Sequence, residues 1–471
     1  MPGVGRADEF LVCNGATDAG QRASQGRVRQ SFGEPLNARD LPASKGGTVN
    51  FSTSASRQRR DVAGRLAVVS LLSCMVKVHA QDPFAPWLRY NLGKVVILPR
   101  AEVATSYTDN LFNMSGSGRV ADGITSVTPG LKLKWDENAV ADASLDYRHG
   151  ETLIWDNSAF NSSSDNVDAR VSYTAAKWRA TGTGSFSESK ALQPGSLNQG
   201  RNLLGTTRLQ GSANAWYDWT PKSDLSAAVN YQSLDYDSRY LSDQEQVEGR
   251  LGAAYEITTR LRWTVDAKVG HTRVMFNQVT RPAVSSVFYG GLLGLRGSFT
   301  EKLKGALRLG YEGRQFDSGR SFSASTPAVG LDLTYQASVL TQMALTYDRS
   351  TSVGAWQGGQ LTINDSVGLR VTHALGITGR WVVSGNGRMS FGDYQWDRSA
   401  FPPGYPDVSR TDTSFGVDLA VQYRPQPWLT CAGGYSLDRY ILNFNDPFVS
   451  QFFLARSYLA NRVFVSVAVG F

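Results

Sequence analysis

Apolar and polar residues alternate with a period of two along most of the chain after residue 96. Between residues 261 and 270, Leu, Trp, Val, Ala and Val occupy one face, and Arg, Thr, Asp, Lys and Gly occupy the other. The same alternation recurs at 329–336 and 415–424. A period of two places successive side chains on opposite faces of a strand. The pattern therefore predicts an all-β chain whose strands carry one apolar and one polar face.

Short polar turns and longer polar loops separate these strands in regular alternation. The turns lie at 136–138, 175–177, 220–223, 258–260, 300–302, 336–338, 376–379 and 425–427. The longer segments are rich in Gly, Asn, Asp and Ser, and lie at 113–122, 154–164, 188–201, 237–245, 277–284, 317–326, 352–360, 392–411 and 442–455. Each repeat is therefore a strand, a long loop, a second strand and a short turn.

Alternating short and long connections are typical of outer-membrane barrels, which have short periplasmic turns and longer outer loops. A β-propeller shares the repeat length but places four strands in each repeat, whereas each repeat here holds two long strands. Charged residues also recur at mid-strand on the polar face, as expected for a water-filled lumen. We therefore predict a transmembrane antiparallel up-and-down β-barrel of about 18 strands, with about 16 as the main rival.

Aromatic residues follow the turns. Those beside a short turn or at the C-terminus are Trp135, Trp178, Trp219, Trp263, Phe299, Tyr335, Trp381, Tyr423, Trp428 and Phe471. A second set lies further along the strands, and comprises Tyr147, Phe186, Tyr231, Tyr311, Tyr347 and Tyr435. Aromatic rings favour the membrane–water interface, so the two sets predict an inner and an outer aromatic belt.

A basic segment at 57–65 precedes an apolar run at 66–76 and a small-residue site that ends at Ala80. These three features in this order are typical of a secretory signal peptide. The apolar run is too short to cross a bilayer as a helix. We expect cleavage near Ala80 and export from the cytoplasm.

The chain then divides into four expected parts. These are a disordered extension or an upstream start site at 1–56, the signal peptide at 57–80, a periplasmic N-terminal segment at 81–96 and the outer-membrane barrel at 97–471.

Composition narrows the classes of function. Residues 1–80 hold 11 Lys or Arg and 6 Asp or Glu, whereas the rest of the chain holds 37 and 35. The basic excess therefore belongs mainly to the leader, which argues against a nucleic-acid partner. The 3 Cys exclude a disulfide framework.

Motifs for catalysis or metal binding are absent from the sequence. His149, His271 and His373 lie on different predicted strands, without the Cys or His spacing of a metal site. No local pattern indicates a Ser–His–acid set, although such a set can assemble across strands. We expect no enzyme, no catalytic residue, no cofactor and no metal.

The polar face supplies the candidate pore-lining residues. By strand phase these are Lys132, Lys134, Arg148, Arg170, Arg179, Arg208, Arg250, Arg262, Asp266, Lys268, Arg296, Lys304, Arg308, Asp332, Arg370, Arg388, Asp418 and Arg424. Further acidic residues of the same phase are Asp142, Asp146, Asp168, Glu248, Glu256, Glu312 and Asp348. Because basic residues exceed acidic ones, we expect a slight preference for anions. The long segment at 392–411 is a candidate constriction.

Two further motifs resemble known sequences. The last strand places Val463, Val465, Val467, Val469 and Phe471 on one face, and a terminal Phe in this position resembles the signal read by the outer-membrane assembly machinery. The run from Ser106 to Phe112 contains a Tyr-x-Asp-Asn-x-Phe pattern, and Pro129-Gly130-Leu131 follows in the second strand. These residues resemble the β-barrel porin type 2 family over about residues 90–471.

That resemblance implies an outer-membrane barrel associated with exopolysaccharide gene clusters, in a Gram-negative bacterium. We therefore expect a porin-like channel for passive passage of polar solutes or secreted polysaccharide, with a role in exopolysaccharide export. The alternative is a structural or adhesive barrel with a plugged lumen that binds polysaccharide through its outer loops. Expected partners are outer-membrane lipid, the barrel assembly machinery, and polysaccharide with its export apparatus.

Overall fold

The computed structural model describes residues 88–136, 140–192, 203–238, 241–276, 283–317, 323–353, 360–376, 378–396, 410–444 and 457–470. The chain divides into two units, 1–57 and 58–471, and every described residue belongs to the second. The predicted extension at 1–56, the signal peptide with Ala80, and Phe471 lie outside the described residues.

The described residues form strands joined by turns and two short 3-10 helices. The strands are β1 Tyr90–Leu92, β2 Val95–Thr108, β3 Asp122–Asp136, β4 Ala141–Ile154, β5 Ser162–Thr174, β6 Trp178–Leu192, β7 Leu203–Thr220, β8 Ser223–Tyr236, β9 Ser242–Thr258, β10 Leu261–Phe276, β11 Val284–Ser298, β12 Leu303–Asp317, β13 Ser323–Ser338, β14 Thr341–Val353, β15 Gln360–Leu375, β16 Trp381–Trp396, β17 Arg410–Gln426, β18 Leu429–Phe444 and β19 Tyr458–Val469. The 3-10 helices are η2 Gly116–Gly118 and η3 Ser158–Phe160. No helix among the described residues is long and apolar enough to span a membrane.

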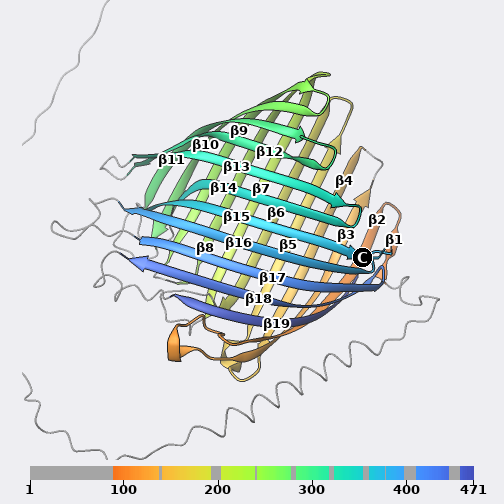
Figure 1. The fold of residues 1–471 in the computed structure, drawn as a ribbon, viewed down its shortest axis with the longest axis vertical. Coiled ribbons are helices and arrows are strands. Elements are labelled where there is room, and N and C mark those ends of the chain that lie inside the picture. The colour runs from red at the N-terminus through yellow and green to blue at the C-terminus, as the bar shows by residue number, and fades with distance from the viewer. Residues whose placement is uncertain are drawn as a thin grey trace, which may run out of the picture. The chain divides into compact units, whose positions relative to one another are not determined.

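The strands β2 to β19 close into one antiparallel barrel. Each strand pairs with the next, and β19 returns to pair with β2 from Arg462 opposite Thr108 to Val469 opposite Ala101. This confirms the predicted barrel of 18 strands and shows that the rival count was wrong. Figure 1 shows the near strands crossing the far strands at a steep angle, as tilted strands of a closed barrel do.

A short hairpin precedes the barrel. β1 pairs with the start of β2, with Tyr90 opposite Ile97. Gly93 makes the turn possible, because its φ of +63° suits glycine and strains most other residues. β1 and its turn lie within the segment 81–96, whereas the second strand of the hairpin is the first strand of the barrel and begins at Val95.

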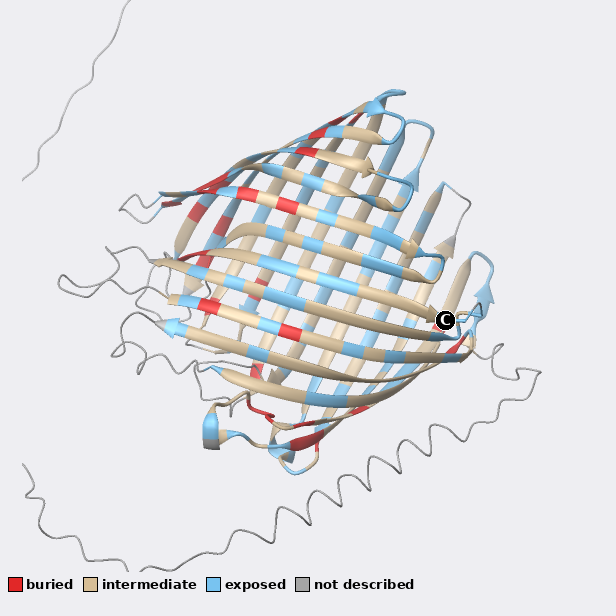
Figure 2. Cartoon of the chain, viewed as in Figure 1, coloured by how far each residue is buried: buried red, intermediate tan, exposed pale blue. Residues whose placement is uncertain are grey.

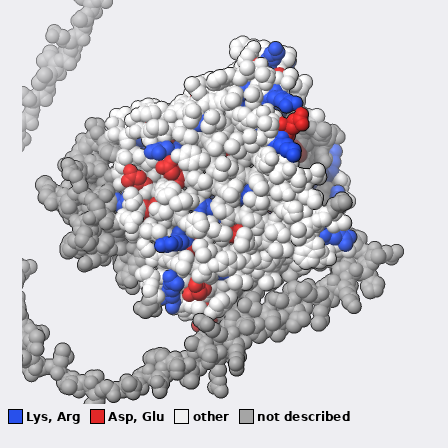
Figure 3. Space-filling model, in the orientation of Figure 1, with Lys and Arg blue, Asp and Glu red and all other residues white. Residues whose placement is uncertain are grey.

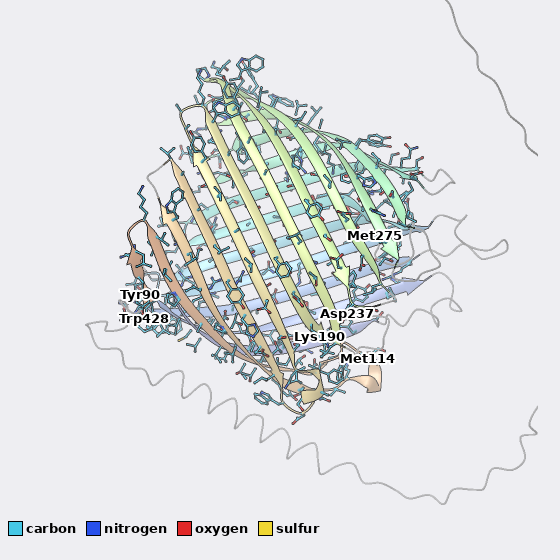
Figure 4. All side chains as sticks on the ribbon, turned by 180° about the vertical axis from the view of Figure 1, so that it is seen from behind. Tyr90, Met114, Lys190, Asp237, Met275 and Trp428 are labelled. Atoms are coloured by element: carbon cyan, nitrogen blue, oxygen red, sulfur yellow. The ribbon has the colours of Figure 1, made fainter. Side chains whose placement is uncertain are left out.

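The long and short connections lie at opposite ends of the barrel. Figure 4 shows Tyr90 and Trp428 at one end, and Met114, Lys190, Asp237 and Met275 at the other. The first end carries the short turns and the second carries the long loops. The structure therefore has the asymmetry that the alternation of connections predicts.

The outer face of the barrel is apolar. Trp263, Val265 and Val269 on β10 are each more than half exposed, as is Leu293 on β11. Exposed and less exposed residues alternate along most strands (Figure 2). The outer surface carries few charges on the face shown in Figure 3. Large exposed apolar side chains in regular rows are the surface that a lipid bilayer covers.

A repeated tyrosine contact marks the loop-side border of this apolar face. Five outward tyrosines each donate their hydroxyl to a polar residue on the next strand: Tyr147 to Asp165, Tyr231 to Glu245, Tyr311 to Ser325, Tyr347 to Asp365 and Tyr435 to Asn461, at 2.6–3.1 Å. In every case the tyrosine lies opposite Val or Pro, and the acceptor is two residues nearer the loop. We call these five contacts the tyrosine border.

Candidate functional site

The pairing register places all the predicted pore-lining positions on the face opposite the outer apolar side chains. Arg262 shows the geometry: its guanidinium donates to Asp224 on β8 at 2.8 Å, two strands away, while its neighbour Trp263 points outward. Arg296 on β11 reaches the same carboxylate at 3.2 Å. These side chains converge on the inner face of the barrel. The prediction that they line an ion-conducting pore stays a prediction.

Many inner charges form ion pairs that remain in contact with solvent. Arg308 lies 2.6 Å from Asp332, and the two side chains are 37% and 53% exposed. Arg388 bonds to both Asp418 and Asp438, and all three are at least one-third exposed. Charges that were packed into a filled barrel would be buried, so these side chains border open space inside the barrel rather than a packed core.

Several inner cations have no carboxylate partner among the described residues. They are Lys132, Lys134, Arg170, Arg208, Lys304, Arg370 and Arg424. Three of the predicted inner acids have no cationic partner among the residues that the structure describes. They are Asp142, Asp266 and Asp348. The uncompensated charge of the inner wall is therefore positive.

The loop-side end of the β14–β15 hairpin lies inside the barrel wall. Pairing between β13 and β14 stops at Val329 opposite Arg349, while β14 continues to Val353 against Leu361 of β15. Strand alternation puts Val353 and Leu361 on the outer face of the hairpin. However, both pack against Val274 and Phe316, which belong to the inner face of β10 and β12. The outer face of this hairpin end therefore covers the inner face of the neighbouring wall, and we call residues 350–353 and 360–363 the inner hairpin.

The part of the inner wall that the inner hairpin covers carries several side-chain hydrogen bonds and an ion pair. Glu312 is 2% exposed, receives a hydrogen bond from Thr351 of the inner hairpin, and pairs with Lys268 at 2.7 Å. Arg314 is 3% exposed and donates to Thr272 and Ser286 at 3.1 and 3.0 Å. The overlap narrows the loop-side mouth along β10–β13.

The first long loop begins after Thr108 in the structure, earlier than predicted, and also folds against the inner wall. Leu111 and Phe112 pack on Ile154, an inward residue of β4, and the Phe112 ring meets Phe160 edge-on with centroids 5.1 Å apart. Leu111 and Phe112 border a cavity of about 560 Å³ that Arg462 of β19 also lines. The mouth is thus narrowed from a second side.

The Tyr-x-Asp-Asn-x-Phe motif closes the seam between the first and last barrel strands. Asp109 accepts two hydrogen bonds of 2.7 Å from the backbone and side chain of Asn461 on β19. Asn110 is 1% exposed and donates to the carbonyl groups of Leu459 and Met114. The motif extends the β2–β19 contact beyond the last ladder pair, so these residues form a clasp across the seam.

Some predicted features lie elsewhere or outside the described residues. Most of the candidate constriction at 392–411 is not described. His149 bonds to Asp165 and Glu151 at 2.9 and 3.0 Å, beside the tyrosine border. Among the described residues, no three His, Cys, Asp or Glu side chains gather as a metal site.

The sequence analysis missed several inner charges, among them Arg100, Glu102, Asp224, Arg314, Asp438 and Arg462. Arg100 bonds to Asp146 two strands away. Its position in the alternation of β2 could have revealed it, although Pro99 interrupts the pattern there.

Comparison with solved structures finds similar barrels at low identity. The FrpB iron transporter from Neisseria meningitidis is 9% identical with a TM-score of 0.42, over 74% of this chain and 62% of that one. The chain thus spans about six-tenths of FrpB. The siderophore receptor PirA from Pseudomonas aeruginosa is 10% identical with a TM-score of 0.41, over 81% of each chain. BauA, the ferric preacinetobactin receptor from Acinetobacter baumannii, is 9% identical with a TM-score of 0.43, over 79% and 80%.

Comparison with curated proteins finds no match. A family model described as "Putative beta-barrel porin 2" matches residues 82–470, a range that includes every described residue. The match agrees with the family resemblance carried by the motif at 106–112. The chain belongs to this family of porin-like outer-membrane β-barrels.

Proposed function

We propose that the protein is a passive outer-membrane channel for polar solutes, and that a secreted polysaccharide is among them. The observation that carries this proposal is the solvent exposure of inward charged pairs such as Arg308–Asp332. A barrel of 16–18 strands is wide enough to leave an aqueous channel. The association of the family with exopolysaccharide clusters supports the export role.

The channel favours anions. Unpaired lysines and arginines outnumber unpaired acids on the inner wall, and charges lining a pore tune its selectivity. The inner hairpin and the first loop narrow the mouth, so the channel admits solutes selectively by size.

Single-channel recording tests this function. The purified protein in a planar bilayer is expected to give a steady open conductance, which graded malto-oligosaccharides reduce as they enter. Absence of conductance from a folded barrel, checked by its heat-modifiable mobility on a gel, would contradict the channel function.

A structural or adhesive barrel is the second candidate. The inner hairpin favours it, because this segment occupies part of the lumen. In that case the folded barrel would not conduct, and polysaccharide would bind to the outer loops. The export apparatus and the assembly machinery remain proposed partners, the latter through Phe471.

A further inference from the structure

Two neighbouring rows of inward side chains cross the wall from β3 to β9. The first row is Lys132, Asp146, Asp168, Ser185, Gln210, Gln232 and Gln246, and the second is Lys134, Ser144, Arg170, Thr183, Ser212, Asn230 and Glu248. Within each row, every residue lies directly opposite the next. All of them except Lys134 line one cavity of about 610 Å³. We call this cavity the inner groove.

The inner groove is long. Neighbouring strands lie about 4.8 Å apart, so seven strands give a groove about 29 Å from end to end. A groove of this length suits an extended chain better than a single small ion.

The carboxylates of the groove are already neutralised. Asp146 is bonded by Arg100, Asp168 lies 2.5 Å from Arg148, and Glu248 lies 3.0 Å from Arg250.

In contrast, Lys132 and Arg170 have no carboxylate partner within the described part of the chain. Lys134 lies opposite Ser144, which lies opposite Arg170. Uncompensated positive charge therefore gathers at the β3–β5 end.

The other end of the groove carries amides and hydroxyls. Gln210, Gln232 and Gln246 lie side by side on three consecutive strands. The amides of Gln210 and Gln232 have no hydrogen-bond partner among the described residues. Each amide offers two donors and an acceptor, which matches a ligand rich in hydroxyl groups.

Aromatic side chains are scarce in the groove. Tyr231 is the one aromatic residue among the described lining residues, and its hydroxyl donates to Glu245 on the outer face. Single-stranded nucleic acids bind largely by stacking on aromatic rings. The lining therefore suits an anionic chain of sugars rather than one of nucleotides.

We propose that the inner groove binds an acidic oligosaccharide, with its carboxylates at Lys132 and Arg170 and its hydroxyls along the three glutamines. This inference deepens the proposed function, because it names the class of solute that the lumen recognises. Charge-assisted hydrogen bonds at the cationic end supply much of the affinity.

Titration calorimetry on the full-length protein in detergent tests the site without requiring conductance. Tetragalacturonate is the acidic probe and maltotetraose is the neutral one. The variant Lys132→Gln/Arg170→Gln is expected to bind tetragalacturonate about tenfold more weakly or worse. The matched control is Lys304→Gln/Arg370→Gln, which removes two unpaired inner cations outside the groove and is expected to keep the affinity nearly unchanged.

Three results would overturn the site. They are no binding of tetragalacturonate by the unmodified protein, equal binding of maltotetraose, or an equal loss in both double variants. The last result would show that the total lumen charge attracts the sugar. The channel function and the sugar site can be refuted separately. A barrel that binds the acidic sugar but does not conduct would contradict the channel function. A barrel that conducts but does not bind the sugar would contradict the site.

Discussion

At the scale of single residues, a clasp of two side chains holds the shortest seam of the barrel. β19 pairs with β2 from Arg462 to Val469, whereas neighbouring ladders run through most of each strand. Asp109 and Asn110 add hydrogen bonds at the loop end of this seam. The sequence motif identifies these residues as a pattern, but their partner Asn461 lies at the far end of the chain. Local pattern alone therefore cannot predict the clasp.

Replacing Asp109 tests the clasp. In Asp109→Ala the amide groups of Asn461 lose their acceptors, which costs about 1–3 kcal/mol of stability. We expect a lower urea midpoint in unfolding followed by tryptophan fluorescence. The control is Asp156→Ala, because Asp156 is exposed in another loop and its side chain makes no bond among the described residues. Equal midpoints for the two variants would show that Asp109 does not hold the seam.

At the scale of elements, the sequence predicts the 18 barrel strands but neither the short strand β1 nor the overlap of two walls. Residues 348–352 are all polar, so the apolar–polar alternation of β14 stops after Tyr347, and the sequence predicts a loop at 352–360. Alternation records only which residues share a face. It does not record what that face meets. The inner hairpin depends on contacts with β10 and β12, which only the closed barrel brings near. The predicted constriction at 392–411 was argued from length alone, and most of it lies outside the described residues.

A charge at the buried contact should expel the inner hairpin. Leu361 is 1% exposed, and burying an unpaired carboxylate there costs several kcal/mol. We expect Leu361→Asp to move the hairpin off the wall and to raise the single-channel conductance. Thr372→Asp is the control, since it adds the same charge to the inner face of the same strand away from this contact. Unchanged conductance in Leu361→Asp would show that the hairpin does not limit the pore.

At the scale of the whole molecule, the excess of unpaired inner cations sets the sign of ion selectivity. We expect a reversal potential that favours chloride in a potassium chloride gradient. Removing Lys304 and Arg370 as glutamines should shift this potential toward zero, because the field of a lumen sums over its charges. A potential that favours potassium in the unmodified protein would refute the anion preference. The excess of inner basic residues over acidic ones follows from the alternation of residues along each strand. Which of these charges form ion pairs depends on the three-dimensional pairing register.

The tyrosine border has a consequence for the position of the barrel in the bilayer. Its five contacts lie on β4, β8, β12, β14 and β18, and so surround the barrel, each with an apolar residue below and a hydrogen-bonded polar group above. Contacts spread around the circumference can resist tilting in every direction. Any tilt would carry at least one bonded pair into hydrocarbon and lift an opposite apolar residue into water, at a cost in free energy on both sides. We therefore expect the tyrosine border to resist tilting of the barrel and to set the height of its mouth above the lipid.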